Sequence, residues 1–124
     1  MHELGIVTYI ARQVDQVAEE NGIKEIAEVV LETGEVSGIV PELLTDAWDY
    51  FRMHYAVLEH STLRCETIRA VTFCGNCERN YHTVKYGKTC PYCGSENTWL
   101  LVGRECNIKE ILVPDDTEDT LRSP

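Results

Sequence analysis

The sequence contains no apolar run that approaches the roughly 18 residues needed to cross a membrane. Its first residues, Met1-His2-Glu3, carry no basic flank of the kind that begins a secretion signal. These two absences predict a cytoplasmic protein with no membrane association. In that reducing compartment, six cysteines, four of them in two close pairs, indicate metal ligation before disulfide bonds.

Basic residues are scarce as well. The chain has 11 Lys and Arg against 21 Asp and Glu, which gives a formal net charge of −10. Affinity for nucleic acid comes largely from Lys and Arg that displace counterions, so this charge argues against nucleic acid as a partner. The sequence also has no Gly-rich phosphate loop and no visible nucleophile–base pair, which argues against an enzyme.

The remaining composition is that of a globular protein, with 44% apolar and 26% charged residues among 124. This length suits one domain that carries a smaller one. Helical periodicity runs from Leu4 to Asn21 and again from Pro41 to near His60. Runs that favour β-strands occur at residues 25–33, 62–69 and 105–113.

This pattern predicts an α+β fold. Two helices and a three-stranded sheet form one expected domain, residues 1–69 plus 103–124. The segment between the last two strands, residues 70–102, is too short to be stabilised by burial alone. We therefore expect it to form an inserted zinc-ribbon-like domain that a metal holds together.

The inserted segment carries two Cys-x-x-Cys motifs, Cys74 to Cys77 and Cys90 to Cys93, separated by twelve residues. Each motif turns tightly enough to aim two thiolates at one point, and two such motifs complete a tetrahedron around a metal. Four thiolates leave no open position, which favours structural Zn(II). Iron in a rubredoxin-like electron carrier is the nearest alternative, and a thioredoxin-like dithiol fits the spacing less well.

His2 directly after Met1 indicates a second metal site. The Met1 amine, the His2 amide nitrogen and the His2 imidazole can close successive small chelate rings on one ion. Nitrogen donors in one plane suit Ni(II) or Cu(II) better than Zn(II). On spacing alone, a histidine at position two is more often just a flexible terminal residue than a metal ligand.

Other motifs bear on this choice, and in chain order they are Met1-His2-Glu3-Leu4, Gly34-Glu35-Val36-Ser37-Gly38-Ile39, Pro41-Glu42-Leu43-Leu44, the two cysteine pairs, Gly103-Arg104-Glu105 and Ile108-Lys109-Glu110-Ile111. Together they resemble the HypA family over residues 1–113. Members of that family are accessory proteins that insert nickel during [NiFe]-hydrogenase maturation. An amino-terminal Met-His-Glu combined with a late four-cysteine insert is specific to few families.

The resemblance implies a metallochaperone, not an enzyme, with nickel as its cargo and zinc as a structural ion. It implies a nickel site of Met1, His2 and Glu3, in which His2 is the key ligand and Glu3 supplies a backbone nitrogen or a nearby carboxylate. The implied partners are a HypB-type GTPase and the hydrogenase large subunit precursor, and some relatives also serve urease. A homodimer is also considered. The alternative function is a regulatory or protein-interaction zinc-ribbon protein with no nickel role.

The other cysteines and histidines receive structural interpretations. Cys65 and Cys106 fall in expected strands and are interpreted as buried core thiols, with a reversible metal or redox role as the alternative. His54, His60 and His82 are interpreted as packing or solvent-exposed residues rather than ligands.

Overall fold

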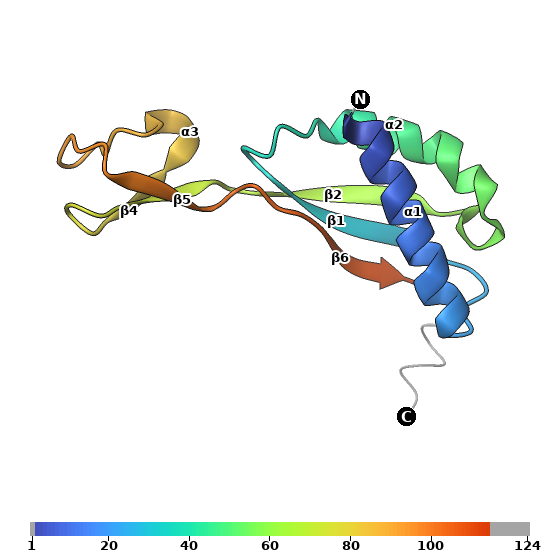
Figure 1. Cartoon of the computed structure of the whole chain (residues 1–124). Helices are drawn as coiled ribbons and strands as arrows, with labels where there is room; N and C mark the ends of the chain where they lie inside the picture. The colour runs from blue at the N-terminus through green and yellow to red at the C-terminus, as the bar shows by residue number, and fades with distance from the viewer. Residues whose placement is uncertain (1, 115–124) are drawn as a thin grey trace. The chain divides into compact units, whose positions relative to one another are not determined.

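The computed structural model describes residues 2–114, with the backbone but not the side chain of His2 (Figure 1). Its described residues divide into two compact units. The first comprises residues 2–31, 40–65 and 108–114, and the second comprises residues 32–39 and 66–107. The second unit contains all of the expected insert, 70–102, together with short segments on either side of it. The expected boundaries of the domains stay a prediction.

Helix α1 (His2–Glu20) supplies much of the core of the first unit. Its buried residues recur at the spacing of one helix face and are Val7, Ile10, Ala11, Val14 and Ala18. The helix begins at His2, two residues before the expected start at Leu4. Past its end, Gly22 adopts a left-handed φ of 68°, and the Ile23 amide donates to the Ala18 carbonyl oxygen at 2.8 Å.

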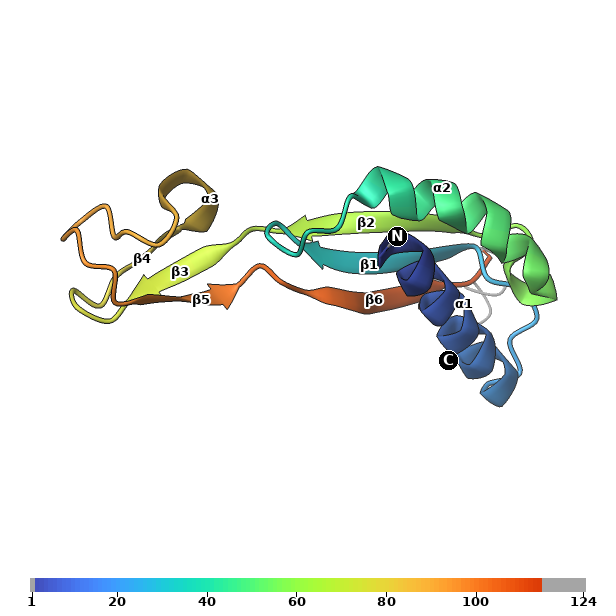
Figure 2. The same cartoon turned by 45° about the horizontal axis from the view of Figure 1, so that its top comes forward.

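Helix α2 (Pro41–Phe51) begins at the proline that suits a first helical turn. Its fully buried Trp48 donates from Nε1 to the Ser61 hydroxyl at 3.0 Å, so the indole nitrogen is satisfied inside the core. This helix packs against α1 beside the sheet (Figures 1 and 2).

The expectation that this helix continues to near His60 is wrong. Two 3-10 turns, η1 (Arg52–His54) and η2 (Ala56–Leu58), follow α2, with Tyr55 in an extended conformation between them. The break lets the chain turn inward, so that Leu58 is fully buried. The Arg52 guanidinium donates to the Glu59 carbonyl and holds the turn closed.

The larger sheet contains β1 (Glu28–Gly34), β2 (Thr62–Ile68) and β6 (Cys106–Leu112) in the order β2-β1-β6. Figure 2 shows β1 and β2 running in the same direction and β6 in the opposite one. The crossover through α2 joins the two parallel strands, as parallel pairing requires. All three strands expected from the sequence are therefore present, and the α+β prediction is confirmed.

The smaller sheet lies in the second unit and was not expected from the sequence. It contains β3 (Val71–Cys74), β4 (Asn80–His82) and β5 (Thr98–Val102) in the antiparallel order β4-β3-β5. The short helix α3 (Thr83–Tyr86) follows β4 directly. The buried Thr72 joins the sheet to this helix, because its hydroxyl lies 2.6 Å from that of Thr83.

Two short hydrogen bonds join segments of the second unit that are distant in the sequence. The Gly34 amide donates to the Glu105 carbonyl at 2.7 Å, and the Ala70 amide donates to the Glu35 carboxylate at 2.8 Å. A Cβ atom built on Gly34 would lie 2.0 Å from the Gly103 carbonyl oxygen, so only glycine permits this approach. The motifs around Gly34 and Gly103 are thus explained by backbone packing.

Two single-residue expectations concern the remaining cysteines. Cys106 is exposed, so its interpretation as a buried core thiol is wrong, and Cys65 is half-buried. The reason is that β6 is an edge strand whose residues 106–110 are all exposed.

No helix in the described part of the chain is long and apolar enough to span a membrane.

Candidate metal centre

The two cysteine motifs fold as near repeats of one turn. In the first, the Glu78 amide donates to the Cys74 carbonyl at 2.8 Å, and the Cys74 amide donates to the Arg79 carbonyl at 2.9 Å. In the second, the Gly94 amide donates to the Cys90 carbonyl and the Cys90 amide to the Ser95 carbonyl, both at 2.9 Å. The same backbone turn therefore places both pairs of thiols.

Each turn needs a left-handed residue four positions after its first cysteine. Gly94 occupies this position in the second turn with a φ of 77°, and Glu78 occupies it in the first with a φ of 60°. A residue with a Cβ pays about 1 kcal/mol for that conformation. Glu78 is the only described residue other than glycine with a positive φ, so the strain is concentrated at the cysteine turn.

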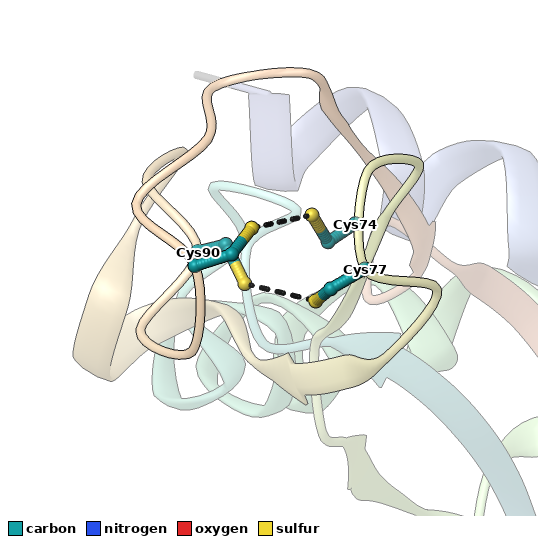
Figure 3. Close-up of side chains that lie close together, drawn as sticks. Cys74, Cys77 and Cys90 are labelled. Carbon is teal, nitrogen blue, oxygen red and sulfur yellow. Dashed lines mark hydrogen bonds between the residues drawn. The ribbon is translucent and has the colours of Figure 1, made fainter.

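The four thiols converge. Their sulfur atoms all lie within 4.8 Å of one another, and the Cys74 to Cys93 and Cys77 to Cys90 separations are both 3.6 Å. Figure 3 shows Cys74 and Cys77 facing Cys90 across the space between the two turns. A tetrahedron with metal–sulfur bonds of about 2.3 Å has edges of about 3.8 Å, so the donor set fits one tetrahedral ion.

Hydrogen-bond donors surround the sulfur atoms. The Asn76 side-chain amide lies 3.4 Å from the Cys93 sulfur, and the Tyr92 backbone amide lies 3.4 Å from the Cys90 sulfur. Cys74 and Cys90 are buried, and the buried Tyr81 belongs to the same apolar cluster. Such donors stabilise thiolates and restrict how the ligands can rotate.

The surroundings of the thiols shift their pKa values in opposite directions. The hydrogen bond from Asn76 is the main cause that lowers the pKa of Cys93 to about 6. Burial is the main cause that raises the pKa of Cys77 to about 12. The pKa of Cys90 is lowered by backbone hydrogen bonds, in spite of its burial. A bound cation would be needed to bring Cys77 to the thiolate form near neutral pH.

The structure describes only part of the expected nickel site. Met1 lies outside the described residues, and His2 is the first residue of α1. Glu3 is buried, with 9% of its surface exposed, and its Oε2 atom accepts a hydrogen bond from the Val40 amide at 3.1 Å. The carboxylate of Glu3 therefore joins the start of α1 to the residue that caps α2.

The other candidate ligands do not gather. Among the described residues, the single group of three or more side chains placed to hold a metal is the four cysteines. His82 is exposed in β4, and His54 and His60 are exposed around the 3-10 turns. Sequence reasoning missed Asn76 as a supporting group, and it missed the hydrogen bond between Glu3 and Val40. A polar residue inside a Cys-x-x-Cys turn was a usable signal for Asn76, but nothing in the sequence pointed to contact between Glu3 and Val40.

The fold and the site together define a class: a small α+β protein with a zinc-ribbon-like site of four cysteines. Residues 1–113 match the family model described as HypA, hydrogenase/urease nickel incorporation, metallochaperone. The chain belongs to the HypA family.

Individual relatives agree with this assignment. The chain is 31% identical over 111 residues to the hydrogenase maturation factor HypA of Aquifex aeolicus, covering 90% of this chain and 96% of that protein. A solution structure of a HypA protein has a TM-score of 0.71 at 24% identity, covering 92% of this chain and 97% of the other. The solution structure of the Ni metallochaperone HypA from Helicobacter pylori has a TM-score of 0.66 at 21% identity, with coverages of 90% and 96%. These two structures support the fold.

Proposed function

We propose that this protein is a nickel metallochaperone that binds Ni(II) at its amino terminus and delivers it during [NiFe]-hydrogenase maturation. The observation that carries the proposal is the match of residues 1–113 to a family of nickel-incorporation metallochaperones. The protein acts by binding and transfer and catalyses no reaction. Its partners are a HypB-type GTPase and the hydrogenase large subunit precursor, in the cytoplasm.

Cys74, Cys77, Cys90 and Cys93 hold a structural Zn(II) ion. Two sulfur–sulfur separations of 3.6 Å support this assignment, because they approach the edges expected of a tetrahedral zinc–thiolate site. With four protein ligands the ion has no open position for a substrate. Its role is to hold β3, β4 and β5 in place.

Nickel binds to the Met1 amine, the His2 amide and the His2 imidazole. The first amides of a helix have no carbonyl partner within that helix, and they point together toward its amino terminus. His2 begins α1, which supports a chelate built from backbone nitrogens at this end. The helix dipole opposes a bare cation there but favours the deprotonated amide that a chelated Ni(II) ion requires.

Glu3 contributes through its backbone nitrogen, and its carboxylate serves the protein fold instead. The hydrogen bond from the Val40 amide at 3.1 Å and the burial of Glu3 support this division of roles. The carboxylate thereby fixes the start of α1, and with it the direction in which the terminal nitrogens point.

Addition of four glycines before Met1 tests the contribution of the terminal amine, because a single added residue would place the histidine third and create a new chelate of amine, two amides and imidazole. We expect the four-glycine variant to lose tight nickel binding, because the amine moves out of the chelate while every side chain is retained. Isothermal titration with Ni(II) measures the effect, and a variant with four glycines added after Pro124 is the matched control. Equal nickel affinity in all three proteins would exclude the amine as a ligand. No specific nickel binding in any of them would instead favour a zinc-ribbon protein that acts in regulation or protein interaction.

A further inference from the structure

The second unit contains a cavity that neither metal site uses. Its volume is about 450 Å³, within the range of ligand-binding pockets. Three tyrosines contribute to its lining, Tyr81 from β4, Tyr86 from α3, and Tyr92 from the second cysteine turn. Tyr81 is buried and donates to the Gly87 carbonyl at 2.8 Å, while Tyr86 and Tyr92 are exposed. The cavity therefore has one fixed aromatic wall and two accessible aromatic rings.

Two cations lie on the accessible rings. The Arg79 guanidinium carbon is 4.9 Å from the centroid of the Tyr92 ring, and the Lys85 ammonium nitrogen is 5.4 Å from that of Tyr86. Both distances are within the range of a cation–π contact. No carboxylate in the described part of the chain forms an ion pair with Arg79 or Lys85. Their charges are positioned by aromatic rings and are not neutralised by an acidic side chain.

The charge around the cavity is opposite to that of the protein. The whole chain has a net charge of −10, whereas the cavity is lined by Lys85, His82, Asn80 and tyrosines, and by no Asp or Glu. The net negative charge of the protein would repel an acidic partner, whereas the cations at this cavity would attract one. Charge complementarity therefore selects both the type of partner and the place where it binds.

We propose that this cavity, lined by Tyr81, Tyr86, Tyr92 and Lys85 and flanked by Arg79, binds an acidic segment of a partner protein. A carboxylate of that segment lies between Arg79 and Lys85, and a neighbouring aromatic or apolar side chain packs against the tyrosines. The inference deepens the proposed function, because delivery of a metal requires docking on other proteins. Its evidence is independent of the nickel site.

Nucleic acid fits this surface less well than an acidic peptide does. A phosphate backbone needs a series of cations along its path, whereas this cavity has Arg79 and Lys85. A mixed aromatic and cationic pocket suits a short protein segment, in which one carboxylate and one apolar side chain can be bound together.

Titration of the zinc-loaded full chain with a synthetic peptide tests the proposal. The probe is acetyl-Glu-Glu-Phe-Glu-Glu-amide, and the matched peptide replaces each glutamate with glutamine. We expect the acidic peptide to shift the backbone amide signals of residues 79–86 and 92 in two-dimensional NMR spectra, and the glutamine peptide to bind at least about fivefold more weakly. Lys85→Glu and Arg79→Gln should each weaken binding of the acidic peptide by a similar factor.

Lys88→Glu is the control, because Lys88 belongs to the same unit and undergoes the same charge change but does not line this cavity. Equal loss of binding in Lys88→Glu and Lys85→Glu would overturn the proposal, as would equal binding of the two peptides. Displacement of the acidic peptide by a thymidine oligonucleotide at equal concentration would assign the cavity to nucleic acid instead. Nickel titration of Lys85→Glu separates this test from that of the proposed function, since its nickel affinity should equal that of the wild type.

Discussion

Cys90→Ser is expected to remove zinc from the protein and to abolish the ordered structure of β3, β4 and β5. The Cys90 sulfur is buried and lies 3.6 Å from that of Cys77, so serine would leave the metal with three thiolates inside a small apolar cluster. Structural zinc contributes on the order of 10–16 kcal/mol of apparent binding free energy in small modules, and the smaller sheet has few other sources of stability. Zinc analysis and the dispersion of amide signals from residues 71–102 measure the two effects.

Cys106→Ser is the matched control for this experiment. Cys106 is exposed in β6 and does not belong to the four-cysteine group, so its variant should retain one zinc ion per chain and the wild-type spectrum. If Cys90→Ser also retained one zinc ion and full spectral dispersion, the four-thiolate site would be wrong. Purification of the wild type with iron in place of zinc would favour the rubredoxin-like alternative.

His2→Ala is expected to abolish specific nickel binding and hydrogenase maturation while zinc content stays at one ion per chain. Alanine favours helix more than histidine does, so the start of α1 should be preserved. We therefore expect a change in unfolding free energy within about 0.5 kcal/mol of zero. Nickel titration, zinc analysis and thermal unfolding of the same preparation give the three readouts.

His54→Ala serves as the control, because His54 is an exposed histidine outside both proposed metal sites. It should bind nickel like the wild type. Loss of nickel binding in His54→Ala but not in His2→Ala would move the site to the 3-10 turns after α2. Loss in neither variant would exclude a site built on either histidine.

Much of this fold follows from local patterns. The apolar spacing in α1 and Pro41 at the start of α2 predicted two helices, because each pattern reflects a geometry that a single element imposes on its own residues. The cysteine pairs were similarly informative, since one backbone turn fixes both thiols of a pair. These features depend on residues that are close together in the sequence.

The features that sequence reasoning missed depend on distant contacts. Continuation of α2 beyond Phe51 was predicted from periodicity, but burial of Leu58 requires the chain to turn inward at Tyr55. Burial of Glu3 depends on the Val40 amide, 37 residues further along the chain. Exposure of Cys106 follows from its position on an edge strand, which the order of strands decides. No local pattern encodes any of these three features.

X-ray absorption at the nickel and zinc edges of one preparation tests the central claim most directly. The wild type loaded with one equivalent of Ni(II) should show nickel surrounded by nitrogen and oxygen only, with the outer-shell scattering of an imidazole. The same sample should show zinc bound by four sulfur atoms at about 2.3 Å. Sulfur in the nickel shell, or nitrogen in place of sulfur around zinc, would contradict two separate sites with these ligands.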